Sequence, residues 1–176
     1  MNEELKLVKL NSGYCNYLRL FDSRVPYNFG KKELRPFVGV LFEVNNIKYF
    51  APLSSPKIKY LKMKNKLDFL RLDNGKLGAI NFNNMLPVQN NNIEFLNLNK
   101  KCLTTSEEKY QKLLKEQIFW LNRNSEKLFR RAKKLYYNYN CKKIDKKIYN
   151  RCCNFKLLEE KCLEYNEKIL VNEELV

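Results

Sequence analysis

The sequence predicts an α+β fold in which an antiparallel, barrel-like β-sheet is decorated by α-helices. Strand patterns and turn signals fill residues 1–100, and apolar residues at helical spacing fill residues 104–170. No internal repeat or low-complexity linker separates the two parts. The chain has 176 residues, of which 44% are hydrophobic, and this is enough for the core of one domain of ordinary size. We therefore expect a single domain over residues 1–176.

The first expected elements are a strand and a short helix. Residues 5–10 (LKLVKL) alternate apolar and basic side chains, which is typical of a strand. Residues 11–22 predict a helix with Ser12 as its N-cap. Its apolar face has the spacing i, i+3, i+4, i+7 and consists of Tyr14, Tyr17, Leu18 and Phe21. Two prolines, a glycine and four basic residues then predict a mobile loop over residues 23–36.

Two hairpins follow. Residues 37–44 (FVGVLFEV) form an apolar run typical of a buried strand, and the Asn-Asn pair after them is a turn signal. Residues 47–53 return as the paired strand, with Pro52 near its end because proline has no N–H for the ladder. A basic loop is expected over residues 59–66. The second hairpin turns at Asn74-Gly75, which is the strongest turn signal in the chain.

The rest of the chain predicts two short strands and then helices. The strand sequences are MLPV and IEFLNL. Residues 104–124 form a helix capped at Thr104, Thr105 or Ser106, with acidic residues in its first turn. A very basic helix continues over residues 125–139, and residues 154–169 form the last helix, capped by Asn154.

Charge narrows the class of partner. The chain has 34 Lys and Arg against 19 Asp and Glu, a formal net charge of +15, which favours a nucleic acid or an anionic membrane as partner. A membrane is the less favoured of the two, because no apolar run approaches the roughly 20 residues of a spanning helix. The opening MNEELKLVKL has no signal-peptide pattern, so we expect a cytoplasmic protein with reduced cysteines that mostly fill the core.

Several kinds of chemistry are excluded or disfavoured. The chain has no histidine, so a Ser-His-Asp triad is impossible, and without a C-x-x-C pair a zinc site is not expected. There is no glycine-rich phosphate loop and no D-x-D pair for a two-metal nuclease. Ser54 and Lys57 have the Ser-x-x-Lys spacing of penicillin-recognising enzymes, but Pro56 interrupts the helix that this spacing needs and no K-T-G follows.

The segment YFAPLSSPK, residues 49–57, fits RNA cleavage better. RNA carries its own nucleophile, the 2′-OH, so an enzyme needs only to orient it and to stabilise the charged transition state. Hydroxyls and backbone amides of Ser54 and Ser55 can bind a phosphate oxygen. Lys57 can neutralise charge and, if desolvated, protonate the leaving 5′ oxygen. The expected product is a 2′,3′-cyclic phosphate, made without a metal or cofactor. Taken alone, the same residues also fit an ordinary turn.

A family resemblance supports the chemical interpretation. The segments KLNSGYCNYLRLFDSRVP, RPFVGVLFEVNNIKYFAPLSSPK and LGAINFNNMLPV, with SEKLFRRA and CNFKLLEEKCLEY near the end, resemble the ToxN/AbiQ family. These are endoribonuclease toxins of type III toxin–antitoxin systems. The resemblance spans roughly residues 9–165, and its most specific part is Y-x-A-P-L-[ST]-S-P-K, here residues 49–57.

The resemblance implies a fold, an activity and a set of partners. The implied fold is a compact SH3-like barrel of the MazF/Kid/PemK type with added helices. The implied enzyme cuts RNA at A-rich sites without a metal, in the bacterial cytoplasm. Its implied partners are target mRNAs and a repeat antitoxin RNA, which the toxin cuts into inhibitory pseudoknots. Toxins and pseudoknots close into a ring-like hetero-oligomer, and the system acts in abortive infection against phage. Neither DNA nor a membrane is an implied partner.

The resemblance also implies site residues. Ser54, Ser55 and Lys57 match the family's active-site loop. Tyr14 matches a tyrosine that lines the same site, and either Tyr14 or Lys57 could be the proton donor. Arg35 stands where a basic residue precedes the PFVGV strand. A tyrosine and a lysine that some members use correspond to residues among Tyr27, Lys31 and Lys32.

Further cations are candidates for binding the RNA backbone. They are Lys59, Lys62, Lys64, Lys66, Arg130, Arg131, Lys133 and Lys134. A solvated surface is the alternative for each of them. Two other functions remain open at this point: a non-catalytic basic protein that sequesters RNA, and a protein that binds membrane surfaces or anions in general.

Overall fold

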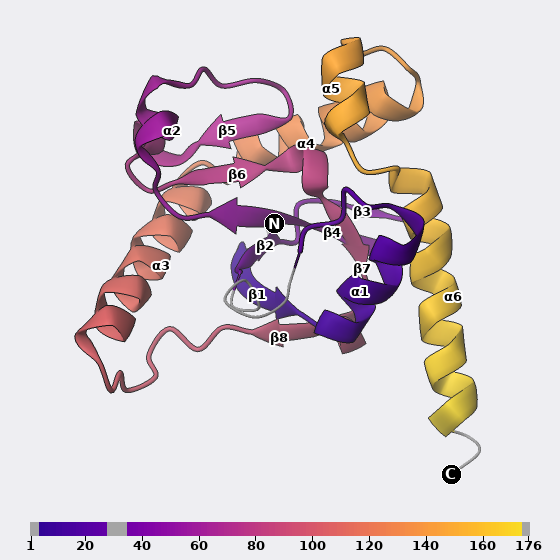
Figure 1. Ribbon diagram of the computed structural model, residues 1–176, viewed down its shortest axis with the longest axis horizontal. Coiled ribbons are helices and arrows are strands. Elements are labelled where there is room, and N and C mark those ends of the chain that lie inside the picture. The colour runs from indigo at the N-terminus through magenta and orange to yellow at the C-terminus, as the bar shows by residue number, and fades with distance from the viewer. Residues whose placement is uncertain (1–3, 28–34, 174–176) are drawn as a thin grey trace.

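The computed structural model describes residues 4–27 and 35–173, and it combines one antiparallel sheet with helices at its edges and faces (Figure 1). The predicted α+β class is therefore confirmed. The strands are β1 Lys6–Leu10, β2 Phe37–Gly39, β3 Glu43–Val44, β4 Ile47–Ser54, β5 Phe69–Arg71, β6 Ala79–Asn81, β7 Leu86–Val88 and β8 Ile93–Phe95.

The sheet is open. Its hydrogen-bonded path is β5-β6-β4-β2-β1-β8, and β3 and β7 both pair with β4 beside this path. Within the described part of the chain, the end strands β5 and β8 do not pair with each other. A closed SH3-like barrel is thus not confirmed by the strand pairing.

Strand β4 is the centre of the sheet and changes partners halfway along its length. Its first half pairs with β3 and β7, and its second half pairs with β2 and β6. Pro52 lies opposite Phe37 near the end of the strand, as predicted, and the next amide, Leu53 N, donates to Pro36 O at 2.9 Å. The change of partners joins two parts of the sheet through one strand, so β4 holds Ser54 at a fixed place where β6 begins.

Both predicted hairpin turns are confirmed. Asn45 and Asn46 have φ of 50° and 63°, the left-handed conformation that a tight hairpin turn requires. The second hairpin turns through η2, Leu72–Gly75, where Asn74 has φ of 53°. The strand predicted over residues 37–44 is divided into β2 and β3. Leu41 and Phe42 both lie opposite the single residue Tyr49, which makes a β-bulge between the two strands.

The helices are α1 Ser12–Phe21, α2 Ile58–Lys62, α3 Thr105–Arg123, α4 Ser125–Asn140, α5 Lys146–Arg151 and α6 Phe155–Glu173. Besides η2, two 3₁₀ turns are η3 Phe82–Asn84 and η4 Asn90–Asn92.

Thr104 caps α3 in a full capping box, and the Asn154 side chain accepts from Leu157 N at the start of α6. The predicted cap of α1 is wrong: Asn11, not Ser12, accepts the hydrogen bond of Tyr14 N. The basic loop predicted at residues 59–66 begins as α2, and α5 was not predicted.

The core ties the sheet to the last helix. Helix α6 packs along α1 and β7, on the right of Figure 1. Tyr49 of β4 is fully buried, and its hydroxyl donates to Glu159 Oε1 of α6 at 2.6 Å. Tyr136 of α4 donates to the same oxygen at 2.8 Å. Burial and the Glu159 carboxylate raise the pKa of Tyr49, so the first residue of the YFAPLSSPK segment has a structural role.

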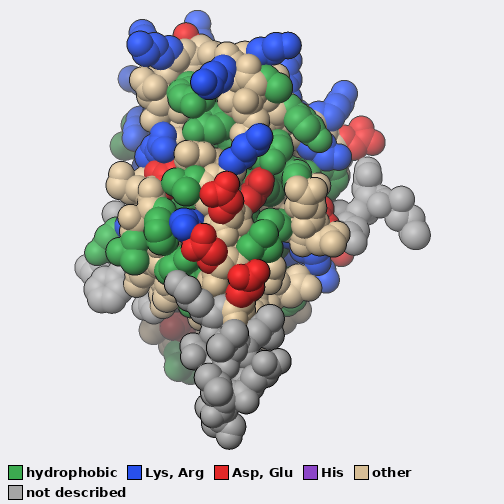
Figure 2. All heavy atoms as spheres, turned by 90° about the vertical axis from the view of Figure 1, so that its right-hand side faces the viewer, with side chains coloured by type: hydrophobic (Ala, Val, Ile, Leu, Met, Phe, Trp, Pro, Cys, Tyr) green, Lys and Arg blue, Asp and Glu red, His purple; other side chains and the backbone are tan. Residues whose placement is uncertain are grey.

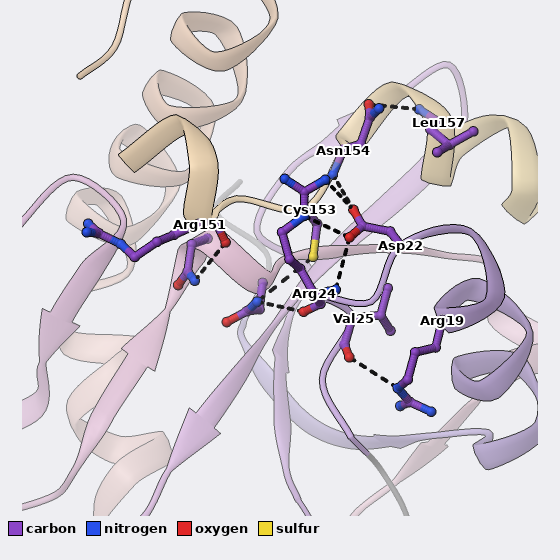
Figure 3. Close-up of polar contacts among 10 residues, drawn as sticks. Arg19, Asp22, Arg24, Val25, Arg151, Cys153, Asn154 and Leu157 are labelled. Atoms are coloured by element: carbon purple, nitrogen blue, oxygen red, sulfur yellow. Dashed lines mark hydrogen bonds and ion pairs between the residues drawn. The ribbon is translucent and has the colours of Figure 1, made fainter. Parts of the chain in front are cut away.

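Polar contacts also fix the chain segment that follows α1 (Figure 3). The buried Asp22 carboxylate accepts from Asn154 N at 2.7 Å and from Arg24 Nε at 2.8 Å. Burial alone raises the pKa of Asp22, but these hydrogen bonds outweigh it and hold the pKa below the ordinary value. Farther along, Arg19 Nε donates to Val25 O at 3.3 Å. The start of the predicted 23–36 loop is therefore anchored to both α1 and α6.

Four of the six cysteines fill the core, as predicted: Cys15, Cys152, Cys153 and Cys162 are buried. Burial raises the pKa of Cys152 to about 12, which keeps its thiol protonated and unreactive at neutral pH. Over residues 4–27 and 35–173, no helix has the length and apolar character needed to cross a bilayer.

Candidate active site

Ser54 is the last residue of β4 and is held from two sides. Its backbone is in register with Ala79 of β6, and its hydroxyl oxygen accepts from Asn81 Nδ2 at 3.0 Å. The side chain is partly exposed. This places an oriented hydroxyl at the end of the central strand, where a substrate can reach it.

Gly78 allows the strands to approach closely at this point. A Cβ atom on Gly78 would lie 1.9 Å from Ser54 O and 3.0 Å from the carbonyl carbon of Ser55, and the residue has φ of +95°. Only glycine combines that conformation with so short a contact. The position of the Ser54 and Ser55 backbone therefore depends on the residue just before the neighbouring strand β6.

Ser55, Pro56 and Lys57 leave the sheet and lead into α2, and all three are exposed. Lys57 stands at the N-cap position of α2, and its ammonium lies 5.8 Å from the ring centroid of Tyr60.

A small apolar cluster holds α2 against the sheet. It consists of Tyr60, Phe69 and Ala79, and the rings of Tyr60 and Phe69 lie 5.5 Å apart. Arg71 of β5 donates to the carbonyl oxygens of Tyr60 at 3.2 Å and of Leu61 at 3.0 Å. These contacts fix the turn that carries Ser55 and Lys57, and Figure 1 shows α2 beside β5 at one end of the sheet.

Arg35 reaches the same place from the start of β2. It precedes Pro36, whose carbonyl accepts from Leu53 N, so Arg35 lies next to the end of β4. Burial lowers the pKa of Arg35, and the neighbouring Tyr60 opposes this effect. No carboxylate in the described part of the chain forms an ion pair with Arg35. A half-buried guanidinium in this state gains most from an anionic ligand.

Tyr14 is not brought to this site. It is fully buried, its hydroxyl donates to Pro87 O at 2.6 Å, and its ring lies 5.1 Å from that of Tyr165. Burial and the neighbouring Cys162 raise its pKa well above the ordinary value. Pro87 pairs with Tyr49, which lies five residues before Ser54 on β4, a strand length of about 17 Å. The structure thus places Tyr14 in the core between α1, β7 and α6.

The alternatives in the loop before β2 are only partly described. Tyr27 is exposed, and the guanidinium of Arg19 lies 4.7 Å from its ring centroid. Lys31 and Lys32 lie outside the described residues.

A pocket of about 300 Å³ lies beside Asn81, the residue that donates to Ser54. Three of the predicted RNA-binding lysines line it: Lys59, Lys64 and Lys66. Asn81, the hydrogen-bond donor to Ser54, also lines it, as does Tyr60. Ser54 itself does not line this pocket, and Asn81 is the residue that links the two.

The remaining predicted cations are distributed around this site. Lys62 is exposed in the last turn of α2. Arg130, Lys133 and Lys134 are exposed on α4. Arg131 differs from them, because its guanidinium donates to the backbone carbonyl of Lys66 and is half-buried, and this burial lowers its pKa. Arg131 thereby ties α4 to the pocket wall.

The side of the molecule formed by α6 has a different charge pattern. Figure 2 shows acidic side chains grouped in the middle of that face, with Lys and Arg gathered above them. Helix α6 contributes Glu159, Glu160, Glu164 and Glu167. Because RNA is repelled by carboxylates, this face is the less suited to bind it.

Sequence reasoning missed three residues of the site. Gly78 and Asn81 were assigned only to a strand, and Tyr60 only to a basic loop. The one available signal was the glycine just before the AIN strand, since glycine in a strand pattern often marks a close backbone approach. The contact between Asn81 and Ser54 spans 27 residues and has no local signature.

Comparisons with known proteins identify the family of this chain. A family described as the toxin ToxN of type III toxin–antitoxin systems matches residues 6–163. The chain is 30% identical over 167 residues to an endoribonuclease ToxN of Bacillus thuringiensis subsp. kurstaki, covering 93% of this chain and 85% of that protein. It is also 30% identical over 178 residues to an endoribonuclease ToxN of Pectobacterium atrosepticum, covering 97% and 99%, respectively.

Solved structures show the same fold. One, from work on selective toxin inhibition by a non-coding RNA pseudoknot, superposes with a TM-score of 0.79 at 30% identity, covering 94% of this chain and 99% of that chain. Another is AbiQ, a lactococcal anti-phage endoribonuclease of a type III toxin–antitoxin system. It superposes with a TM-score of 0.81 at 28% identity, also covering 94% and 99%.

Proposed function

This chain belongs to the ToxN family of toxins of type III toxin–antitoxin systems, and we propose that it is an endoribonuclease whose active site comprises Ser54, Ser55, Lys57 and Arg35. The observation that carries the proposal is the set of contacts at the end of β4. There, the oriented hydroxyl of Ser54 and the exposed residue Ser55 lie beside two cations, Arg35 and Lys57. Neither cation forms an ion pair with a carboxylate among the described residues. That combination suits a phosphodiester.

The proposed reaction uses the substrate's own 2′-OH as the nucleophile. The 2′ oxygen forms a bond to phosphorus while the bond from phosphorus to the 5′ oxygen breaks. The products are a 2′,3′-cyclic phosphate and a free 5′-OH. The proton of the 2′-OH is lost to a base, and the 5′ oxygen gains one from a donor.

Each residue has a separate task in this reaction. The hydroxyls and amides of Ser54 and Ser55 bind a non-bridging phosphate oxygen, and Asn81 orients Ser54. Arg35 and Lys57 neutralise the charge that develops on the phosphorane. Lys57 is favoured over Tyr14 as proton donor, because Lys57 is exposed beside the serines and Tyr14 is buried in the core.

The proposal includes cleavage without a metal. Within the described residues, no group of three or more His, Cys, Asp or Glu side chains could hold a metal ion. Positioning and electrostatics then supply the catalysis.

The proposal also covers the toxin's partners. We assign to this chain the cutting of target mRNAs and of its own repeat antitoxin RNA, inhibition by the resulting pseudoknots in a ring-like assembly, and an anti-phage role in the bacterial cytoplasm. The relatives' pseudoknot inhibition and anti-phage activity support these assignments. We also propose that the sheet is related to the SH3-like barrel. The change of partners within β4 supports this.

Two substitutions test the proposal. Lys57→Ala and Ser55→Ala are expected to lower the single-turnover cleavage rate more than about 100-fold and to relieve growth inhibition, because each removes stabilisation of the transition state. Lys48→Ala is the matched control, since Lys48 lies at the other end of β4 and bonds Asn90. The parent is expected to cleave fully in EDTA and to leave cyclic phosphate ends.

Other outcomes would contradict the proposal. Cleavage that is lost in EDTA and restored by Mg²⁺ would show a metal-dependent mechanism. If both variants kept their RNA affinity and toxicity and no product RNA appeared, the protein would instead act by sequestration, for which its charge of +15 is suited. Binding to anionic vesicles without a preference for folded RNA would indicate a general anion-binding protein.

A further inference from the structure

A buried side chain of α3 bonds the turn that joins β5 to β6, residues 72–78. Gln117 lies on the inward face of α3, among buried leucines, and is 1% exposed. Its Nε2 donates to the carbonyl oxygen of Leu77 at 2.7 Å. The bond thus connects α3 to a residue 40 positions earlier in the chain, immediately before Gly78.

The 72–78 turn supports the loop that carries the proposed active site, residues 54–60. A Cβ atom on Gly75 would lie 2.8 Å from the backbone carbonyl of Tyr60, and one on Gly78 would lie 1.9 Å from Ser54 O. At both of its ends, the 54–60 loop therefore rests directly on the backbone of this one turn.

Hydrogen bonds hold the backbone of Gly78 on both sides. Its N–H donates to Gly75 O at 3.2 Å, and its carbonyl accepts from Leu72 N at 3.0 Å. Gln117 holds the carbonyl of Leu77, which belongs to the same peptide group as the N–H of Gly78. The position of the turn against the 54–60 loop therefore depends in part on a side chain of α3.

The contribution of Gln117 to stability does not explain its amide. Its Oε1 is buried and has no hydrogen-bond partner in the described part of the chain, which is costly in a folded protein. An apolar side chain of similar size would remove this unpaired oxygen and leave the oxygen of Leu77 unpaired in its place. Glutamine therefore leaves as many oxygens unpaired as an apolar residue would, and what it adds is a donor that fixes the Leu77 carbonyl.

We propose that Gln117 is a positioning residue for RNA cleavage, which acts through the peptide between Leu77 and Gly78 to hold Ser54 and Ser55 at the scissile phosphate. The proposal rests on the endoribonuclease function proposed above. Because Gln117 is buried, it acts on the serines and not on the RNA.

Gln117→Met is the first test, since methionine has a similar length and no donor. A methyl group needs about 3.5 Å to its neighbours, so the 2.7 Å approach is lost and the Leu77 carbonyl can shift by up to about 1 Å. A shift of that size at the reacting groups can cost about 100-fold in rate. Because only part of it reaches the serines, kcat is expected to fall about tenfold.

Two further readouts separate positioning from a structural role. The KM for the RNA is expected to stay within about twofold of the parent, because Gln117 does not bind RNA and the exposed cations are unchanged. The midpoint of thermal unfolding is expected to stay within about 4 °C of the parent, since the number of unpaired oxygens does not change.

Gln111→Met is the matched control. Gln111 lies on the same helix, and its Nε2 donates to the backbone carbonyl of Lys100, also at 2.7 Å. Lys100 lies between β8 and α3 and is not part of the 72–78 turn. This variant loses the same kind of hydrogen bond and is expected to keep the parent kcat.

A double variant tests whether Gln117 acts through Gly78. Because Gly78→Ala alone displaces the serines, adding Gln117→Met is expected to lower kcat by less than about threefold more. A further tenfold loss would show that the two residues act independently and would contradict the proposal. If Gly78→Ala does not fold, the single variants decide.

The proposed role of Gln117 fails on its own in three cases. Folded Gln117→Met protein could cleave within threefold of the parent, or the Gln111→Met control could lose kcat equally. Gln117→Met protein that does not fold, or that unfolds well below the expected range, would assign the residue a structural role. A parent protein that cuts no RNA would instead contradict the proposed function.

Discussion

Replacing Gly78 with alanine tests whether the close approach of β6 to β4 is needed for catalysis. The new Cβ would lie 1.9 Å from Ser54 O, whereas real Cβ atoms essentially never come closer than 3.0 Å to such an atom. The two strands must therefore separate by about 1 Å at this point. The residue also has φ of +95°, a conformation that costs a residue with a side chain about 1–3 kcal/mol.

The expected effect on cleavage follows from this displacement. Ser54 and Ser55 would move relative to the scissile phosphate by about 1 Å, and a misplacement of that size can cost about 100-fold in rate. The measurement is single-turnover cleavage of one RNA at saturating enzyme, well below the unfolding midpoint. Thermal unfolding followed by circular dichroism gives the loss of stability separately.

Gly13→Ala is the control for the glycine substitution itself. Gly13 lies within α1, where alanine is the better helix former, and its Cβ would meet no atom closer than 3.1 Å. This variant is expected to cleave at the parent rate. If folded Gly78→Ala protein also cleaves within threefold of the parent, the idea that β6 sets the position of the two serines is refuted.

Three further predictions concern stability. Tyr49→Phe is expected to lower the free energy of unfolding by about 1.5–3 kcal/mol in chemical denaturation while the cleavage rate of the folded protein stays unchanged, because only a hydrogen bond to the Glu159 carboxylate is lost. Asp22→Asn is expected to be less stable than the parent at neutral pH. Because folding lowers the pKa of Asp22, its contribution is fully present above the unfolded value of 3.8 and is lost as pH falls through the folded value, so the two unfolding curves should converge below about pH 4. Thr104→Ala removes the cap of α3 and should cost about 0.5–2 kcal/mol in thermal unfolding, whereas an unchanged midpoint would show that the helix end is frayed.

Much of the fold could be predicted because its signals are local. The Asn45-Asn46 and Asn74-Gly75 turns, a cap among Thr104, Thr105 and Ser106, and the apolar spacing of the helices all depend on neighbouring residues, and the structure confirms them, with Thr104 as the cap. Proline explains the end of β4 in the same way. Local signals did not distinguish Asn11 from Ser12 as the cap of α1, since both residues are good caps.

The open sheet and most of the site geometry could not be predicted, because they depend on contacts distant in sequence. Strand β4 changes partners according to which strands reach it, and no local pattern shows this. Ser54, Ser55 and Lys57 came from one recognisable segment, but their surroundings come from residues 35, 78 and 81. Tyr14 was placed at the site by resemblance alone, and its helical spacing equally fits the core position that the structure gives it.

The exposed segment 61–66, which begins at the end of α2, separates the pocket lining from the strand that holds Ser54. Ser54 is held by β4 and by Asn81 of β6, whereas residues 61–66 are exposed, and Met63, Lys64 and Lys66 among them line the pocket of about 300 Å³. Substitutions at these exposed positions are therefore expected to change the lining of the pocket without moving Ser54. The residues that line the pocket and the hydroxyl of Ser54 thus lie on separate segments of the chain.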